Sequence, residues 1–337
     1  MSRELKDSPR VQFGWCLTHR TVYLIALELW RIGRTGTRPS LAEKNQRLRK
    51  GKHAVILAHN YQRPEIQDIA DFVGDSLELS LRAAKTEAKL IVFCGVTFMA
   101  ETAAILNPDK KVLIPDGNAL CPMAAMLPAE LVRLYRQKHP DAEIVLYINT
   151  LAEAKAECDA VCTSANPAEI INKMDSETVL FGPDLNLAEY ASNFTKKQII
   201  PIPTFSFCPV HKLFSRETIL ELKRANPDAE VIAHPECNPE VQRVADFVGS
   251  TSKMCKEASE SKARKFIVAT EIGLLHRLQK ERKDADFVPA YEQAVCVNMK
   301  LHTLEKVYLS LRDERYEVTV PPDVAERARK AIELMVR

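Results

Sequence analysis

Three cysteines recur at a regular spacing in this chain of 337 residues. Cys121, Cys208 and Cys296 are separated by 87 and 88 positions, and each lies in a segment expected to be the loop after the last strand of a repeated unit. Thiolates are soft ligands that favour zinc or iron–sulfur clusters, so three thiolates that meet would form a metal site. The ordinary alternative for each cysteine is a buried apolar residue of its loop.

The number of these cysteines limits the choice of metal. A structural zinc takes four ligands, often in C-x-x-C pairs, and the chain has no such pair. Three thiolates instead suit one 4Fe–4S cluster with an open iron, which can polarise a substrate oxygen. The spacing therefore predicts Lewis-acid chemistry rather than electron transfer. The remaining cysteines occupy no repeated position: Cys16, Cys94, Cys158, Cys162, Cys237 and Cys255.

The cysteine spacing is also the period of an internal repeat. Residues 59–76 (HNYQRPEIQDIADFVGDS) and 234–251 (HPECNPEVQRVADFVGST) are identical at nine of 18 positions. A more diverged copy at 147–164 keeps the frame, with Asp159 aligned to Asp71 and Asp246. The unit is therefore present three times, with a period of 87 to 88 residues.

Each repeat reads as strand, helix, short strand, second strand, helix and third strand. The first strands are near-continuous apolar runs (AVILAH, EIVLYIN and EVIAHP), which is typical of parallel strands covered on both faces. Alternating strands and helices indicate right-handed βαβ units. We therefore expect an α/β fold of three similar parallel-sheet repeats around a pseudo-threefold axis. The alternative is an elongated stack of three domains.

The predicted domain division follows the same period. It comprises an N-terminal extension (1–38), a helix (39–52), three α/β repeats (53–139, 140–226 and 227–314) and a C-terminal segment (315–337) with a final helix that begins at a proline pair.

When the three repeats are aligned, two columns of equivalent positions hold polar residues where the first strand of each repeat ends. One holds His59, Tyr147 and His234, and the other, two positions on, holds Tyr61, Asn149 and Glu236. Residues i and i+2 of a strand point the same way, and the carboxyl ends of parallel strands are where α/β sheets bind ligands. A lone histidine in a strand is more often structural, but this ring is a general acid–base set.

A column of hydroxyl residues precedes a helical pattern in each repeat: Ser76, Ser164 and Thr251. The default role of a hydroxyl there is to cap the helix N-terminus. Three helix N-termini directed at one axis would also form a phosphate site, through free N–H groups and helix dipoles.

Composition is ordinary for a soluble globular protein, with 46% hydrophobic and 27% charged residues and a net charge of +2. The apolar stretch 16–30 contains His19, Arg20 and Glu28, is too short to span a bilayer and is not followed by a small-residue cleavage site. We expect a cytoplasmic protein with reduced cysteines and with neither nucleic acid nor a membrane as partner.

Eight motifs in order carry a family resemblance. They are AHNYQ (58–62), GDSLELS (74–80), FMAETAAIL (98–106), YINT (147–150), CPVH (208–211), AHPEC (233–237), GSTSKM (249–254) and CVNMKLHTLEKV (296–307). From about residue 40 to its end the chain resembles quinolinate synthase, whereas residues 1 to about 38 match nothing in that family. The resemblance implies three α/β domains and one 4Fe–4S cluster on Cys121, Cys208 and Cys296.

The resemblance also implies an activity and a site. The family condenses iminoaspartate with dihydroxyacetone phosphate to quinolinate, with loss of phosphate and water, in de novo NAD synthesis. Whether an L-aspartate-oxidising enzyme passes on the imine directly is left open. On this basis proton transfer falls to His59, Tyr61, Tyr147 and Glu236, and substrate binding to His59, Tyr147, Asn149, His211, His234, Glu236 and the hydroxyl column Ser76, Ser164 and Thr251.

Three positions depart from the family's pattern. Leu120 stands where a glycine usually precedes the first cysteine, Val297 where a proline usually follows the third, and His302 where a threonine is more usual. Two rival functions remain open. Another 4Fe–4S hydro-lyase would not need the hydroxyl column, and a non-catalytic metal-binding scaffold would not need the strand-end columns.

Overall fold

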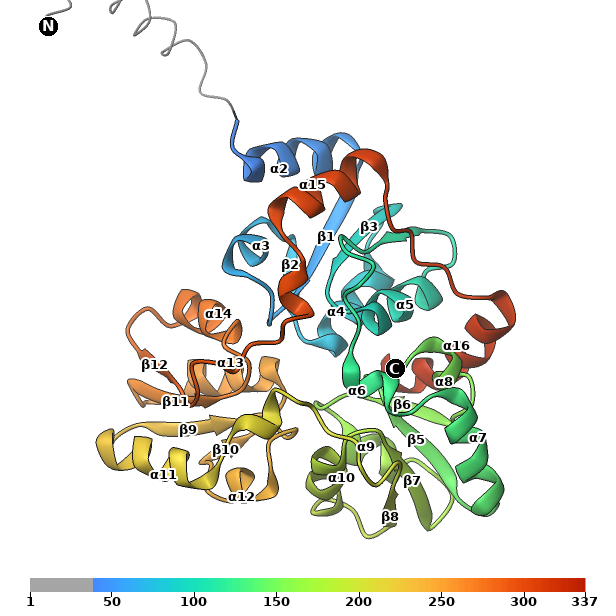
Figure 1. Ribbon diagram of the computed structural model, residues 1–337, viewed down its shortest axis with the longest axis vertical. Helices are drawn as coiled ribbons and strands as arrows, with labels where there is room; N and C mark the ends of the chain where they lie inside the picture. The colour runs from blue at the N-terminus through green and yellow to red at the C-terminus, as the bar shows by residue number, and fades with distance from the viewer. Residues whose placement is uncertain (1–38, 337) are drawn as a thin grey trace, which may run out of the picture. The chain divides into compact units, whose positions relative to one another are not determined.

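The computed structural model describes residues 39–336, which contain three parallel four-stranded sheets (Figure 1). The strand orders are β2-β1-β3-β4, β6-β5-β7-β8 and β10-β9-β11-β12, so each repeat builds the same sheet. The predicted α/β fold of three similar repeats is confirmed. The predicted extension over residues 1–38, with its apolar stretch 16–30, lies outside the described residues.

Each sheet strand except the last is followed by a helix, and two further helices lie between its last strand and the next sheet. The first repeat contains β1 (Ala54–His59), α3 (Pro64–Ile69), β2 (Phe72–Gly74), α4 (Ser76–Lys85), β3 (Leu90–Cys94), α5 (Thr97–Leu106), β4 (Lys111–Leu113), α6 (Pro122–Ala125) and α7 (Ala129–Lys138). The second contains β5 (Glu143–Tyr147), α8 (Ala152–Lys155), β6 (Ala160–Cys162), α9 (Pro167–Asn172), β7 (Thr178–Gly182), α10 (Leu185–Ser192), β8 (Gln198–Pro201), η1 (His211–Leu213) and α11 (Arg216–Ala225). The third contains β9 (Glu230–Ala233), α12 (Pro239–Gln242), β10 (Phe247–Val248), α13 (Thr251–Glu260), β11 (Lys265–Ala269), α14 (Leu274–Glu281), β12 (Asp286–Pro289), η2 (Met299–Leu301) and α15 (Leu304–Asp313).

Two helices lie outside this pattern, α2 (Leu41–Gly51) before the first sheet and α16 (Pro322–Val336) at the C-terminal end. The predicted final helix is present as α16. Its apolar stripe, including Val324, Ala328 and Ile332, is buried in the core formed by the first two repeats. Arg329 Nε donates to the Ile105 carbonyl (3.0 Å) in the first repeat, and Arg327 to that of Ala156 (3.2 Å) in the second, so α16 joins the two. No helix within residues 39–336 is long and apolar enough to cross a bilayer.

The last helix of each repeat packs on the next sheet rather than on its own. Val132 of α7 shares a core with Ile144 and Leu180 of the second sheet, and Ile219 of α11 shares one with strands of the third sheet. In the same way α15 buries Val307 and Leu311 against β1 and β3 of the first sheet, beside α2 (Figure 1). Burying each such side chain contributes about 1.5–3 kcal/mol. Because the third repeat thus returns to the first, the arrangement is closed, and an elongated stack is excluded.

The aspartate that aligns in all three repeats has a structural role. In each repeat its carboxylate accepts the backbone N–H of a central-strand residue, in the pairs Asp71–Ile56 (2.8 Å), Asp159–Ile144 (2.7 Å) and Asp246–Val231 (2.8 Å). This bond ties the start of the short strand to the first strand and sets their register. The aspartate shared by all three repeats therefore stabilises the fold and does not belong to the candidate site.

Replacement of Asp159 by alanine should destabilise the protein by about 1–3 kcal/mol, because the amide of the buried Ile144 loses its partner. The measurement is urea unfolding followed by circular dichroism. Asp109→Ala, at an exposed turn, is the matched control and should change stability little. Equal stability of the two variants would contradict the structural role.

A candidate active site where three repeats meet

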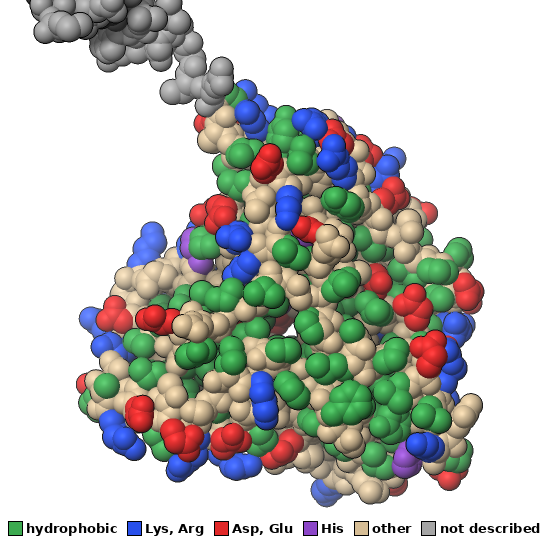
Figure 2. Space-filling view, viewed as in Figure 1, with side chains coloured by type: hydrophobic (Ala, Val, Ile, Leu, Met, Phe, Trp, Pro, Cys, Tyr) green, Lys and Arg blue, Asp and Glu red, His purple; other side chains and the backbone are tan. Residues whose placement is uncertain are grey.

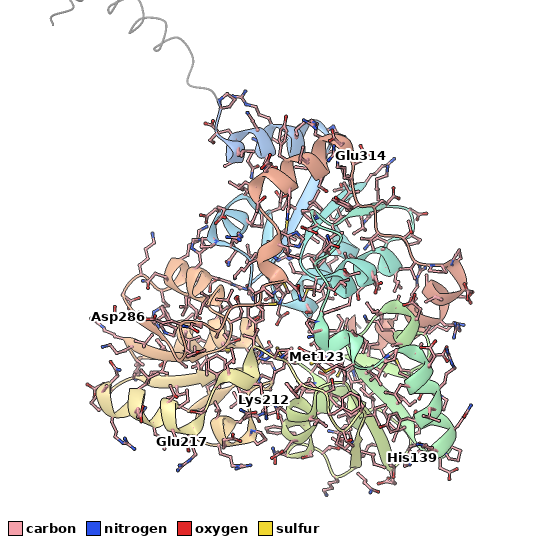
Figure 3. All side chains as sticks on the ribbon, viewed as in Figure 1. Met123, His139, Lys212, Glu217, Asp286 and Glu314 are labelled. Atoms are coloured by element: carbon pink, nitrogen blue, oxygen red, sulfur yellow. The ribbon has the colours of Figure 1, made fainter. Side chains whose placement is uncertain are left out.

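One cavity of about 260 Å³ lies at the carboxyl ends of the three sheets. Figure 2 shows this face hollowed at its centre, and Figure 3 places Met123, a lining residue, near that centre, with His139, Glu217 and Asp286 at the periphery. The structure brings every predicted site residue into this lining: His59, Tyr61, Ser76, Cys121, Tyr147, Asn149, Ser164, Cys208, His211, His234, Glu236, Thr251 and Cys296.

The two strand-end histidines are held in one tautomer by the backbone. His59 Nδ1 accepts the N–H of Tyr61 (3.1 Å), and His234 Nδ1 accepts that of Glu236 (3.3 Å). Nε2 therefore carries the hydrogen in each neutral ring. Burial lowers the pKa of both imidazoles to about 3, more than the nearby Glu236 charge can offset. They are thus neutral hydrogen-bond donors at neutral pH.

Glu236 is the buried anion of the cavity. Its Oε1 accepts the Tyr147 hydroxyl (2.7 Å) and its Oε2 lies 2.7 Å from His211 Nδ1. Asn149 Nδ2 adds a longer contact of 3.4 Å. Burial opposes ionisation, but the interaction with His211 and the hydrogen bonds from His211 and Tyr147 outweigh it and hold the pKa of Glu236 below its ordinary value. Residues of the second and third repeats therefore stabilise one carboxylate.

The two tyrosines keep their protons. Burial, with the Glu236 charge as the second cause, raises the pKa of Tyr61 and Tyr147 well above the ordinary value. The Tyr61 hydroxyl lies 2.7 Å from Thr270 Oγ1, and Thr270 Oγ1 lies 2.9 Å from His211 Nε2. Sequence reasoning missed Thr270, and the repeat offers no signal for it, because Gly95 and Pro183 occupy the equivalent positions.

The prediction that the hydroxyl column caps three helices is wrong. Asp75 caps α4 by accepting from Glu78 N (3.0 Å), Ser250 caps α13, and α9 begins at Pro167, after Asn166. A cap residue needs extended backbone just before the first helical residue, and Ser76 and Thr251 are already helical. Their side chains are free of the capping role and line the cavity, as does Ser164, whose Oγ lies 3.3 Å from His234 Nε2.

The three cysteines fit a shared cluster. All three are half-buried, line the same cavity and are free of disulfide bonds. Burial, followed by the charge of Cys296 among the neighbouring thiols, raises the pKa of Cys121 to about 12, and burial and the Glu236 charge raise that of Cys208 well above its ordinary value. Thiols must lose their protons to bind iron, so loading releases protons. Cys208, His211 and Glu236 also bring ligand atoms within 4.8 Å of one another.

Two buried carboxylates that the sequence did not predict hold the cysteine loops. Asp184 accepts the N–H of Cys208 (3.1 Å), and Glu271, paired with Lys300 Nζ (2.9 Å), accepts that of Cys296 (3.0 Å). The two carboxylates lie 87 positions apart, so the repeat period was a usable signal for them. The equivalent residue of the first repeat is Val96, and there Thr97 holds the loop through the Ala119 carbonyl (2.8 Å).

Another set of equivalent residues holds the loop that follows the first strand of each repeat. Gln67 Nε2 donates to the Gln62 carbonyl (2.9 Å) in its own repeat and to that of Gly273 (2.9 Å) in the third. Gln242 and Lys155, which occupy the equivalent positions, donate to the matching loop carbonyls of Cys237 and Thr150. Burial lowers the pKa of Lys155 to about 8. Each of the three side chains thus holds the loop that carries two predicted site residues.

Known proteins match nearly the whole described chain. The family described as quinolinate synthetase A protein matches residues 43–337. The quinolinate synthase of Methanothermobacter thermautotrophicus is 56% identical over 292 residues, which are 86% of this chain and 96% of the relative. Those of Pyrococcus furiosus (53% over 296 residues, 88% and 97%) and Thermotoga maritima (51% over 286 residues, 85% and 95%) are similar.

The three departures from the family's motifs lie in different surroundings. Leu120 is 55% exposed and does not belong to the cavity lining, whereas Val297, 71% exposed, does belong to it. His302 is fully buried, and its Nε2 lies 2.6 Å from the Gly95 carbonyl, which ties η2 to the end of β3.

The neutral buried histidines predict a loss of stability in acid. Their pKa values are lowered on folding, so between about pH 6.5 and pH 3 the unfolded chain binds more protons than the folded one. The free energy of unfolding should fall by about 1.4 kcal/mol per pH unit for each histidine as the pH drops below about 6.5.

His59→Asn tests this, since Asn Oδ1 can accept the Tyr61 N–H but does not titrate. The pH dependence of urea unfolding should become shallower by one proton. His53→Asn is the control, because His53 is exposed and its positive φ (50°) suits asparagine. An unchanged slope in His59→Asn would contradict the burial effect.

Proposed function

The chain belongs to the quinolinate synthase family, and on this premise we propose that it condenses iminoaspartate with dihydroxyacetone phosphate to quinolinate, releasing phosphate and water. It is an enzyme of NAD biosynthesis that catalyses a condensation. One observation carries the assignment of this cavity: a buried carboxylate, two protonated phenols, two neutral imidazoles and three free thiols line the same space.

Cys121, Cys208 and Cys296 would hold the 4Fe–4S cluster, whose open iron supplies a Lewis acid for a substrate oxygen. Asp184 and Glu271 position two of these thiols by accepting the cysteine N–H groups. Loss of a thiol therefore removes a ligand, whereas loss of a carboxylate loosens a loop.

The hydroxyl column would bind the phosphate of the triose. Ser76 and Thr251 are the first residues of α4 and α13, whose first-turn N–H groups and dipoles favour an anion. Thr251 Oγ1 is oriented by Asn60 Nδ2 (2.8 Å), and Ser164 Oγ by His234. The carboxylates of the imine would accept from the neutral Nε2–H of His59, from the Asn149 amide and from His234.

Glu236 is the base that the geometry favours. Condensation, isomerisation and dehydration all require that protons leave carbon or nitrogen and reach departing oxygens. The ionised Glu236 can accept a proton, and the phenols of Tyr61 and Tyr147 can donate one. The imine substrate is the product of oxidising an amino acid, so the reaction that supplies it is the oxidation of L-aspartate.

Protein purified without oxygen should contain about four iron and four acid-labile sulfide atoms per chain, because three converging thiols suit a 4Fe–4S cluster. Cys208→Ala should lose most of this iron, whereas Cys255→Ala should keep it, since Cys255 is buried between helix and sheet. The measurements are colorimetric iron and sulfide determinations. Zinc in place of iron, or equal losses in both variants, would contradict the cluster assignment.

Glu236→Gln should lower the rate of quinolinate formation by about a hundredfold or more while the iron content stays at the wild-type level, because the amide cannot accept a proton. Glu240→Gln, exposed on α12 of the same repeat, is the control and should retain activity. The readout is quinolinate measured by chromatography alongside iron per chain. Full activity in Glu236→Gln would exclude this residue as the base.

A further inference from the structure

We propose that Asn60, held in one orientation by Arg277, is a positioning residue for the substrate phosphate, because it leaves the hydroxyl hydrogen of Thr251 free for the cavity. The inference rests on the function proposed above and extends the site beyond the side chains that line it. Asn60 is fully buried and Thr251 is 2% exposed. Asn60 does not line the cavity, although its sequence neighbours His59 and Tyr61 do.

The contacts of Asn60 fix which way its amide group faces. A guanidinium has only donors, so the atom that lies 3.1 Å from Arg277 Nη1 is the amide oxygen Oδ1. The amide nitrogen Nδ2 therefore faces Thr251 and donates to its Oγ1 at 2.8 Å. The backbone N–H of Asn60 donates to the Gly74 carbonyl (3.0 Å), which holds the residue in place. The amide cannot turn round without losing both side-chain hydrogen bonds.

The direction of this bond decides what the Thr251 hydroxyl can do. A hydroxyl has one hydrogen to donate, and its oxygen already accepts from Asn60. Among residues 39–336, no atom accepts the hydroxyl hydrogen. It is therefore available to a ligand in the cavity, which Thr251 lines. The oxygens of an ionised phosphate are strong acceptors, so a buried hydroxyl presented as a donor suits this group.

Arg277 is itself fixed between the two helices that border the proposed phosphate site. Its Nε donates to Glu281 (2.7 Å) on its own helix, α14, and its Nη1 lies 3.4 Å from Glu78 Oε2 on α4. The Glu78 carboxylate in turn accepts from Ser252 Oγ (2.6 Å) on α13. The side chain of Arg277 is 18% exposed. Two carboxylates thus hold the guanidinium behind Asn60, outside the cavity.

The arrangement is specific to the junction between the first and third repeats. The equivalents of Asn60 have no side-chain amide and those of Arg277 have no charge: Ile148 and Pro235 for the former, Thr102 and Tyr190 for the latter. The hydroxyl column is repeated three times, but this means of orienting one of its members is not. Thr251 is therefore expected to contribute more to phosphate binding than its place in a repeated column indicates.

Titration of the full-length, cluster-loaded protein with inorganic phosphate, followed by calorimetry, tests the proposal without an activity assay. Asn60→Asp keeps the shape of the side chain but replaces the donor by an acceptor, so Thr251 would donate to it and not to phosphate. The Kd of phosphate should rise about tenfold or more. Asn226→Asp at the end of α11 is the matched control, because Lys265 donates to Asn226 Oδ1 (3.1 Å) and Nδ2 donates onward to the Leu222 carbonyl (2.9 Å).

A double-mutant cycle separates this effect from the charge that aspartate adds. Thr251→Val removes the hydroxyl and should weaken phosphate binding by itself. If Asn60 acts through that hydroxyl, Asn60→Asp should change the Kd by less than about twofold in the Thr251→Val background. Additive losses, equal Kd values for Asn60→Asp and Asn226→Asp, or no phosphate binding by the wild type would each overturn the proposal.

Steady-state kinetics give a second readout. Asn60→Asp should raise KM for dihydroxyacetone phosphate about tenfold or more, with kcat within about twofold of wild type and iron per chain unchanged, because binding and not chemistry is affected. A fall of kcat in parallel with iron content would assign Asn60 a purely structural role and overturn the proposal.

The two measurements keep this proposal and the proposed function apart. If the wild type forms no quinolinate but phosphate binding follows the pattern above, the proposed function fails and the role of Asn60 stands. If the wild type forms quinolinate but Asn60→Asp binds phosphate as the wild type does, the proposed function stands and the role of Asn60 fails.

Discussion

The closure of the ring depends on the transfer of one helix from each repeat to the next sheet. A parallel sheet must be covered on both faces, and the preceding helices of each repeat leave part of one face of its sheet uncovered. The faces are covered in turn by α7, α11 and α15. Because α15 returns to the first sheet, the three sets of carboxyl strand ends face a common centre. Every later feature of the site follows from this packing constraint.

The second constraint is the burial of charge at that centre. An isolated carboxylate costs several kcal/mol to bury unless hydrogen bonds satisfy it. Glu236 is satisfied by Tyr147 and His211, which come from other parts of the chain. The same burial keeps the two strand-end histidines neutral and the tyrosines protonated. One low-dielectric cavity therefore holds a base, acids and neutral donors in distinct protonation states.

Symmetry explains much of the site, and departures from symmetry explain its chemistry. Repeated positions supply loop anchors and side chains at strand ends, and such positions tolerate divergence as long as the fold is kept. Glu236, Asp184 and Thr270 differ from their counterparts in at least one other repeat. The threefold scaffold thus provides three equivalent positions at the centre. Sequence divergence between the repeats has placed different functional groups at these positions.

The 87-to-88-residue period in the sequence by itself determined the fold class and most of the predicted site residues, whereas His211 stands outside the repeated positions and came from the family resemblance alone. Apolar runs identify parallel strands, and equal phase places the three cysteines and the strand-end columns at equivalent points, which any closed arrangement must bring together. The period was also a usable signal for Asp184 and Glu271, although the sequence analysis did not single them out. What the sequence could not decide depends on contacts between segments far apart in the chain.

Only the tertiary structure decided the helix caps, the histidine tautomers, the ionisation of Glu236 and the placement of Thr270. Capping depends on the backbone angles of single residues, which is why Asp75 and Ser250 replaced the predicted Ser76 and Thr251. Ionisation depends on burial and on partners from other repeats. The positions equivalent to Thr270 carry no hydroxyl, and its hydrogen bonds exist only because packing places Tyr61 and His211 on either side of its side chain.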